Sequence, residues 1–216
     1  MRIRYTDFNG SAEAISSTYS IPWTELADAL GGMPLHLKAS EQDGIQGNAV
    51  FDPVGTNDYI AQALRGSAWS GKIPIPDAFG SFGADVDFAK QGMVVEVQFS
   101  NYPFLLNNTI RSEMFFRAGT VFHGAPTGLV VIVTKSGMFP SSNSSLYYEQ
   151  AISQLTALVA QSVFTVPLRL VGLYEEPGPV TATWTTYPGR TSRTVHARET
   201  RTVTITQGAS TKARIT

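Results

Sequence analysis

Hydrophobic and polar residues alternate along MVVEVQF, residues 93–99. A period of two is typical of a β-strand, in which successive side chains point to opposite faces. The alternation places Glu96 and Gln98 on one face of this strand and the valines and phenylalanine beside them on the other. Two polar side chains are therefore expected to point the same way from a single strand.

Other segments show patterns typical of either helices or strands. PWTELADAL, residues 22–30, has a proline in a first-turn position and is followed by two glycines, which predicts a short helix. GLVVIVT, residues 128–134, is a continuous apolar run typical of a central strand buried on both faces. Further patterns predict helices at 104–119 and 146–162 and strands at 166–174 and beyond 180. The order of elements indicates a mixed α/β fold.

Two segments lack a regular pattern. Residues 66–84, GSAWSGKIPIPDAFGSFGA, are rich in glycine and proline and predict a long loop that leads into Asp85-Val86-Asp87. Long ordered loops in compact domains are often functional. The residues from about position 208 onward are expected to be frayed.

Composition limits the class of protein. A chain of 216 residues that is 43% hydrophobic can bury a core of its own, and its length suits one elaborated domain. It contains no cysteine, which excludes disulfides and thiolate metal sites and favours a reducing compartment. The N-terminal residues lack the apolar stretch of a signal peptide, and no apolar run is long enough to span a membrane. We therefore expect a cytoplasmic protein without membrane contact.

Charge is distributed unevenly, although the net charge is only −1. Residues 1–60 hold three basic and eight acidic residues, a balance of 3 − 8 = −5. Residues 177–216 hold six basic and one acidic residue, a balance of 6 − 1 = +5, and alternating threonines there predict β-strands. This C-terminal segment is the best electrostatic candidate for contacting a polyanion. A solvated pair of surface strands is the alternative interpretation.

Asp87 lies nine positions before Glu96, so the end of the preceding loop can bring one carboxylate beside another that projects from a strand. Two carboxylates suit Mg²⁺, which is commonly bound through one or two such groups together with water. The backbone carbonyl of Val97, between Glu96 and Gln98, could supply a third oxygen. Such spacing also arises by chance, and a surface carboxylate pair without metal remains the alternative.

Longer stretches carry a resemblance to a known family. VEVQFSNYPFLLNNT (95–109), followed by Arg-Ser-Glu at 111–113, resembles the active-site segment of type II restriction endonucleases of the PD-(D/E)XK superfamily. Five further stretches resemble the same enzymes in the same order: MPLHLKAS (33–40), FDPVGTN (51–57), IPIP (73–76), MFPSSNSSLYYEQA (138–151) and VPLRLVGL (166–173). The resemblance extends over the chain to about residue 193 and includes irregular loop sequences.

The resemblance implies a fold and an active centre. It implies a restriction-endonuclease-like α/β core over residues 1–176, with a mixed central sheet flanked by helices. Residues 177–216 would form a smaller, basic β subdomain that contacts DNA. Asp87 and Glu96 would bind Mg²⁺, for which Mn²⁺ would substitute, with the carbonyl of Val97 as a further ligand. Gln98 stands where most of the superfamily has lysine. An amide does not titrate near neutrality, so Gln98 would orient the attacking water without serving as its base.

The resemblance also implies residues that contact DNA: Ser100, Asn101, Arg111, Asn143, Ser144, Arg190 and Arg193. Asparagine can bond adenine in a bidentate manner, and serine can serve donors or acceptors on base edges. Helix capping is the alternative role for Asn143 and Ser144. The turn TTYPGRTSRT, residues 185–194, is one residue shorter than its counterpart in the family. The identity of the outermost base pair of the recognition site is therefore left open.

The implied activity is Mg²⁺-dependent cleavage of double-stranded DNA at a palindrome with a central GATC. The first expectation is AGATCT cut after its first base and the second is RGATCY, with 5′-phosphates and four-base 5′ overhangs. A palindrome implies a homodimer with one active site per strand, and helices at 102–119 or 146–162 could form its interface. A cognate DNA methyltransferase would be the functional partner in the host. The rival interpretations are a nuclease that recognises DNA structure and a non-catalytic DNA-binding relative.

Overall fold

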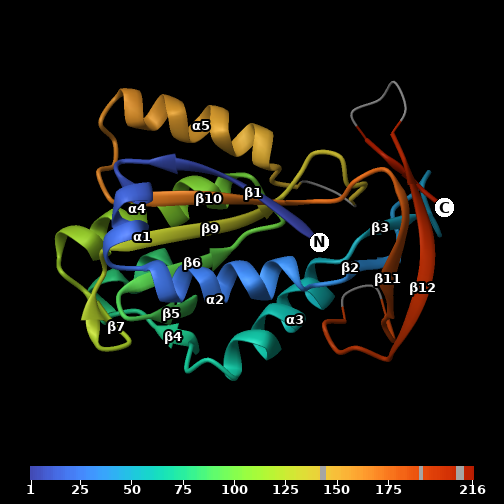
Figure 1. Ribbon diagram of the computed structural model, residues 1–216, viewed down its shortest axis with the longest axis horizontal. Coiled ribbons are helices and arrows are strands. Elements are labelled where there is room, and N and C mark those ends of the chain that lie inside the picture. The colour runs from blue at the N-terminus through green and yellow to red at the C-terminus, as the bar shows by residue number, and fades with distance from the viewer. Residues whose placement is uncertain (142–144, 190–191, 208–211) are drawn as a thin grey trace.

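A six-stranded mixed β-sheet forms the centre of the protein (Figure 1). The computed structural model describes residues 1–141, 145–189, 192–207 and 212–216. The strands of this sheet lie in the order β1-β10-β9-β6-β5-β4. Their bounds are β1 (Arg2–Phe8), β4 (Ser70–Pro74), β5 (Asp85–Lys90), β6 (Met93–Val97), β9 (Leu129–Lys135) and β10 (Leu168–Tyr174). β9 runs parallel to both β6 and β10, and the remaining neighbours are antiparallel.

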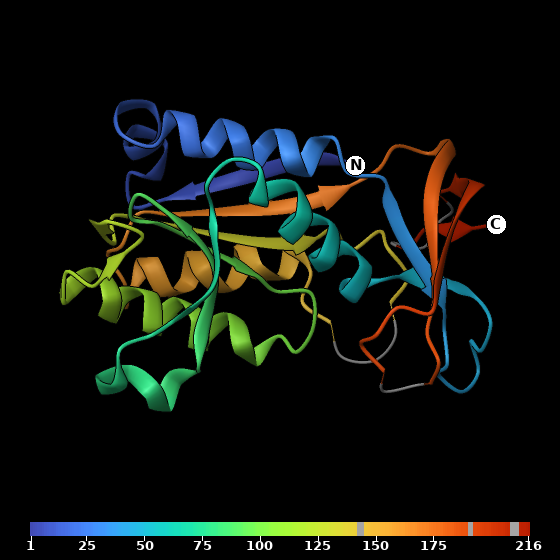
Figure 2. The same ribbon diagram turned by 90° about the horizontal axis from the view of Figure 1, so that it is seen from below.

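Helices cover both faces of this sheet (Figure 2). One face packs against α1 (Ser11–Ser17), α2 (Ser20–Gly31) and α3 (Pro53–Arg65), and the other against α4 (Pro103–Arg117) and α5 (Tyr148–Ala160). All seven residues of β9 are buried, which confirms the prediction of a central strand. Among the described helices, none combines the length and apolar character needed to cross a bilayer.

A second sheet stands at one end of the molecule and has the strand order β13-β12-β11-β2-β3 (Figure 1). Its strands are β2 (Leu35–Ala39), β3 (Ala49–Phe51), β11 (Gly178–Thr186), β12 (Ala197–Thr206) and β13 (Arg214–Ile215). The C-terminal segment therefore does not form this sheet alone, because β11 pairs in parallel with β2 from the first quarter of the chain. The expected boundary at residue 176 does not separate the two sheets. The expectation of a frayed end was wrong for residues 212–216, where β13 pairs with β12.

The prediction of a loop over residues 66–84 was also wrong. This segment contains β4 and the 3₁₀-helix Asp77–Phe82. β4 lies at the edge of the sheet and pairs with β5. Glycine and proline are tolerated on an edge strand, because only one side of its backbone must join the sheet. A short hairpin of β7 (Val121–Phe122) and β8 (Ala125–Pro126) completes the fold.

Lys135, the last residue of β9, is fully buried. Its ammonium group donates to the backbone carbonyl of Phe99 and lies 5.1 Å from the ring centre of Tyr147 and 5.4 Å from that of Phe51. Burial penalises the charged form and lowers the pKa of Lys135 to about 7. The surroundings of Lys135, at the end of the central strand, thus favour its neutral form.

This environment predicts a specific dependence of stability on pH. Between pH 7 and about 10.5 the unfolded chain holds the Lys135 proton more tightly than the folded chain, so this residue's contribution to stability rises with pH in that window. From pH 7 to pH 9 the gain is about 2 kcal/mol, and Lys135→Met should lack it. Urea unfolding of both proteins at the two pH values measures the difference. Equal gains in the two proteins would contradict the assignment.

Candidate active site

β5 and β6 separate at the position where the sequence predicts the chemistry. Their antiparallel pairing runs from the turn at Gln91-Gly92 only as far as Phe88 and Val95. Continued by two residues, the register would set Val97 opposite Val86. Instead, the backbone N–H of Val97 donates to Oδ2 of Asp87 at 2.8 Å. A side-chain carboxylate thus replaces the next ladder bond and fixes the spacing of the two strands.

In β5, the regular alternation of side chains between the two faces of the sheet is also lost at Asp87. Val86 and Phe88 would share a face in an undistorted strand, yet they belong to the clusters on opposite faces of the sheet. On the neighbouring strand Lys72, which the register sets opposite Asp87, has a positive φ of 49°. This local distortion lets the half-buried Asp87 turn toward the gap between β5 and β6.

At Val97 and Gln98, successive backbone N–H groups point alternately to the two neighbouring strands, β5 and β9. Gln98 N–H donates to the carbonyl of Val133 in β9 at 2.8 Å, whereas Val97 N–H points toward β5. In a strand, the N–H and C=O of one residue lie on the same edge. The carbonyl of Val97 is therefore directed toward the gap that contains the Asp87 carboxylate.

Glu96 is buried on the opposite face of β6 from Val95 and Val97, as the alternation predicted. Only 2% of Glu96 is exposed, and one of its oxygens, Oε2, lies 2.7 Å from Nη2 of Arg111 in α4. The other oxygen, Oε1, is buried without a hydrogen-bond partner among the described residues. Glu96 is thus held by one cation and retains one unused acceptor.

Arg111 occupies a different place from the one expected. The sequence interpretation assigned it to a DNA contact, but its guanidinium group lies in the interior, where it pairs with Glu96 and donates to the carbonyl of Phe82 at 3.3 Å. Gly83 provides the space, because a Cβ at this position would lie 2.4 Å from Nη1 of Arg111. The pairing was not visible in the sequence, since residue 111 is brought to residue 96 by helix packing alone.

The electrostatics of the two carboxylates reflect this burial. Burial raises the pKa of Asp87, against the hydrogen bond from Val97 and the charge of Arg111. Burial also raises the pKa of Glu96 to about 8, opposed by Arg111 and reinforced by the negative charge of Asp87. The two acids interact with each other, and Arg111 alone does not compensate them. Such a pair favours an additional positive charge.

A pocket of about 700 Å³ opens beside Asp87. It lies between α3 and the β4–β5 pair, and Asp87, Val97 and Ser100 form part of its lining. Three basic side chains also line it: Arg65 from α3, Lys72 from β4 and Arg193 from the segment between β11 and β12. Basic groups around a carboxylate suit a phosphate-bearing ligand that is held together with a cation. Sequence analysis missed Arg65 and Lys72, because neither lies in a recognisable motif.

The wall formed by α3 is fixed to the second sheet. Asp52 caps α3 by accepting from Val54 N–H at 3.2 Å, and the hydroxyl of Tyr187 donates to both Asp52 oxygens, at 2.9 and 2.7 Å. Tyr187 directly follows β11. The contact joins α3, which forms part of the pocket lining, to the end of β11.

The remaining predicted residues fall into two groups. Gln98 is half-buried and donates its side-chain N–H to the carbonyl of Ser100. Ser100 and Asn101 are exposed in the segment between β6 and α4, and Asn101 has a φ of 52°. The other predicted DNA contacts, Asn143, Ser144 and Arg190, lie outside the described residues.

Known proteins resemble this chain over almost its whole length. The model of the restriction endonuclease BglII/BglIII family matches residues 3–173. The type II restriction enzyme BglII of Bacillus subtilis is 48% identical over 202 residues, which cover 93% of this chain and 89% of that enzyme.

Solved structures show the same similarity. The crystal structure of BglII complexed with a DNA 16-mer matches with a TM-score of 0.94 at 44% identity, over 100% of this chain and 99% of that chain. The crystal structure of free BglII matches with a TM-score of 0.77 at 43% identity, again over 100% of this chain and 99% of that chain. The arrangement of this chain is thus closer to the DNA complex than to the free enzyme. These similarities confirm the predicted restriction-endonuclease-like fold, and the chain belongs to the BglII/BglIII family of type II restriction endonucleases.

Proposed function

We propose that this protein cleaves both strands of DNA at a palindromic site with a central GATC, using a divalent metal ion at Asp87 and Glu96. AGATCT cut after its first base is the first candidate site and RGATCY the second. The observation that carries the proposal is the opening between β5 and β6, where Asp87 and the carbonyl edge of Val97 face a pocket lined with basic residues. The resemblance to BglII supports the choice of DNA as substrate.

The donor set fits Mg²⁺, and Mn²⁺ is expected to substitute for it. Three or more His, Asp or Glu side chains do not gather into a metal-binding group anywhere in the described part of the chain. Mg²⁺ does not require such a group, because it is commonly held by one or two carboxylates and keeps several waters. The unpartnered Oε1 of Glu96, the carboxylate of Asp87 and the carbonyl of Val97 would hold it. When bound, the metal would lower the pKa of water and neutralise charge on the phosphate.

The chain's own residues would position the reactants. Asp87 keeps its side chain fixed through the bond to Val97, so little motion is needed on binding. Gln98 would orient the attacking water, and its amide cannot take the proton. Lys72 and Arg65 would contact phosphate oxygens from the pocket wall.

Sequence readout would come from two places near this pocket. Ser100 and Asn101 lie three and four residues beyond the strand that carries Glu96, so base contacts there would lie close in the sequence to the chemistry. Arg193 lies on the pocket lining together with Ser100. Asn143, Ser144 and Arg190 remain proposed contacts. We further propose a cytoplasmic location and a host methyltransferase that protects the same site.

The proposed reaction predicts the ends that the enzyme leaves. Incubation of plasmid DNA with the protein and Mg²⁺ should give linear fragments with 5′-phosphates and four-base GATC overhangs. Sequencing of the ligated ends identifies the outer base pair. Ends that lack GATC would contradict the proposed specificity, and uncut plasmid under conditions where BglII cuts would contradict the proposed activity.

The role of Asp87 is tested by removing its negative charge while keeping the shape of its side chain. Asp87→Asn retains an oxygen that accepts from Val97 N–H but removes the negative charge, so cleavage should fall by at least about a hundredfold, while binding to cognate DNA persists. Asp87→Ala should also abolish cleavage. Asp85→Asn, two residues earlier on the same strand, is the matched control and should cleave normally. Cleavage by Asp87→Asn at more than a third of the normal rate would exclude Asp87 as a ligand.

We also propose that the enzyme is a homodimer, because a palindromic site presents the same half-site to each of two identical active sites. Three large apolar side chains are exposed around the start of α4: Tyr102, Phe104 and Leu106, each about half exposed. Exposed clusters of this kind mark interaction surfaces. They directly follow Ser100 and Asn101, so a second copy bound there would lie close to the DNA contacts of the first.

The dimer proposal predicts the effect of charge on this surface. The double variant Phe104→Glu and Leu106→Glu should sediment as a single chain at micromolar concentration, whereas the unsubstituted protein sediments as two chains. Val121→Glu is the matched control, because Val121 is 60% exposed on β7, outside this cluster. A dimeric double variant would place the interface elsewhere.

A further inference from the structure

Lys72 of β4 lies where two neighbouring strands change the faces to which their side chains point. In β5, Val86 and Phe88 pack on opposite faces of the six-stranded sheet. Their partners in β4 follow them. A Cβ at Gly71 would lie 3.5 Å from the ring of Phe88, and Ile73 packs with the cluster that contains Val86. Lys72, between Gly71 and Ile73, is therefore the residue at which β4 makes the matching change.

The backbone of Lys72 is strained at this point. Its φ is 49°, in the left-handed region that glycine adopts freely. A longer side chain costs free energy there, and such residues persist only where the surrounding structure holds them, most often at functional sites. Pairing with β5 on both sides, through Gly71 and Ile73, holds the conformation. A lysine is thus kept, against its backbone preference, at the position that the register sets opposite Asp87.

The side chain of Lys72 is exposed and lines the pocket that Asp87 and Val97 also line. Burial raises the pKa of Asp87, and the positive charge of Lys72 is among the groups that oppose this rise. The ammonium group is therefore close enough to the proposed metal ligands to interact with their charge across the pocket.

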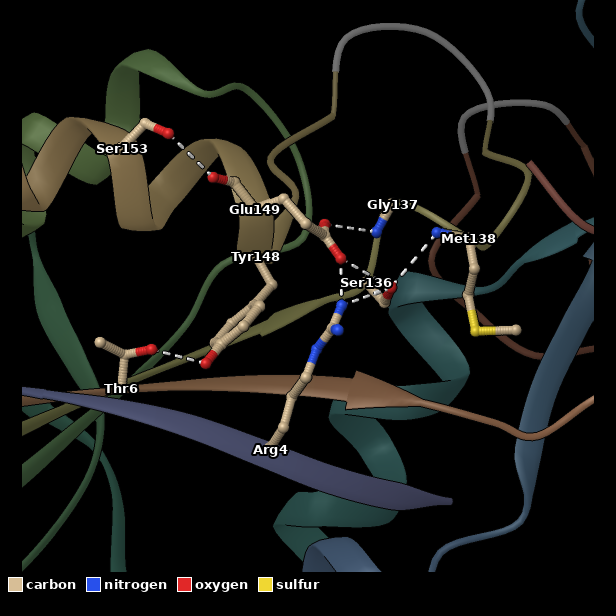
Figure 3. A network of polar contacts seen from close by, with 8 residues as sticks. All are labelled: Arg4, Thr6, Ser136, Gly137, Met138, Tyr148, Glu149 and Ser153. Carbon is tan, nitrogen blue, oxygen red and sulfur yellow. Dashed lines mark hydrogen bonds and ion pairs between the residues drawn. The ribbon is translucent and has the colours of Figure 1, made fainter. Parts of the chain in front are cut away.

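The other basic residues of the six-stranded sheet differ from Lys72, because each of them has a polar partner. These pairs are Arg2 with Glu176, Arg4 with Glu149, Lys90 with Glu25, Lys135 with the carbonyl of Phe99, and Arg169 with Asp7. Figure 3 shows one of them, in which Arg4 bonds to Glu149 and to the hydroxyl of Ser136. The ammonium group of Lys72 makes no hydrogen bond or ion pair with any residue in the described part of the chain. It is available to a ligand in the pocket.

A simple surface lysine is the alternative interpretation of Lys72. Exposed lysines are common on protein surfaces, and one without a partner needs no explanation of its own. A surface lysine, however, gains nothing from a left-handed backbone, and glycine at this position would remove the strain. The strain and the place of the side chain in the pocket together favour a function.

We infer that Lys72 is a catalytic residue, which donates a hydrogen bond to a non-bridging oxygen of the phosphate at which the DNA strand is cut. The inference rests on the proposed function and names the phosphate that Lys72 contacts. A phosphate held at Asp87 and Val97 would lie in the pocket that Lys72 lines. Positive groups that face the oxygens of a reacting phosphate stabilise the transition state. The neutral amide of Gln98 cannot supply such a charge, whereas the ammonium group of Lys72 can.

Three substitutions separate this role from binding of a neighbouring phosphate and from a structural role. Lys72→Gln removes the charge and keeps a long polar side chain. Lys72→Gly removes the whole side chain and also relieves the backbone strain. Lys72→Arg keeps the charge. Arg2→Gln removes the same charge from β1, the opposite edge strand of the sheet, and is the matched control.

The experiment measures three quantities for each protein with the DNA site that the unsubstituted enzyme cuts. They are the rate constant of a single turnover with Mg²⁺ and saturating enzyme, the dissociation constant of the DNA without divalent metal, and the midpoint of thermal unfolding. We expect Lys72→Gln and Lys72→Gly to lower the rate constant by about a hundredfold, as does the loss of other single donors to developing charge. Both should bind DNA within about threefold of normal, because a contact that strengthens in the transition state lowers the rate more than the affinity.

The remaining variants define the cause of this loss. Lys72→Gly should unfold at the normal temperature or above it, since glycine adopts a positive φ without strain. Lys72→Arg should keep at least about a tenth of the normal rate constant, because its charge remains. Arg2→Gln should leave all three quantities unchanged.

Each contrary result has a distinct meaning. A rate constant within threefold of normal for Lys72→Gln overturns the inference and leaves the proposed function intact. Weaker DNA binding with a normal rate constant at saturation also overturns it, and Lys72 then holds only a neighbouring phosphate. A lower unfolding temperature for Lys72→Gly makes the residue structural and overturns the inference as well. If the unsubstituted protein cleaves no DNA, the proposed function fails and the inference fails with it.

Discussion

A single hydrogen bond, from the backbone N–H of Val97 to the carboxylate of Asp87, determines the form of the candidate active site. Two antiparallel strands that stayed paired would satisfy their backbone groups with each other and leave no opening. Because Asp87 takes the place of the next ladder bond, β5 and β6 can part without leaving the Val97 donor unsatisfied. The opening follows from that substitution, and the Val97 carbonyl, which the alternation of the β6 backbone directs toward β5, faces it.

The second constraint on the site is the burial of charged side chains in the interior of the protein. Glu96 could not stay ionised among apolar residues alone, and Arg111 reaches it only because Gly83 leaves room for the guanidinium group. The compensation is incomplete, since Oε1 of Glu96 has no partner among the described residues and the pKa values of both acids are raised. An interior with two carboxylates and one arginine is suited to receive a cation, and substrate phosphate would bring further negative charge to it. Stability and function thus depend on the same charge balance.

How much of this structure can be predicted from the sequence depends on how far apart the interacting residues lie along the chain. The alternation in residues 93–99 and the apolar run at 128–134 predicted β6 and β9, because both patterns are local consequences of strand geometry. β4 was missed, since its strand character comes from pairing with β5 and its composition favours a loop. The pairing of β11 with β2 and the contact of Arg111 with Glu96 join residues far apart in the chain. Asp87, Glu96 and Gln98 were identified through family resemblance, while Lys72 and Arg65 became visible only when α3 and β4 were placed beside them.

The central claim is that the opening between β5 and β6 binds a divalent cation. The most direct measurement is a crystal structure of the protein with cognate DNA and Mn²⁺, in which the metal is located by its anomalous scattering. We expect a peak within coordination distance of Asp87 and the Val97 carbonyl, together with a phosphate oxygen of the DNA. Bound DNA with Mn²⁺ located only at other residues would contradict the claim.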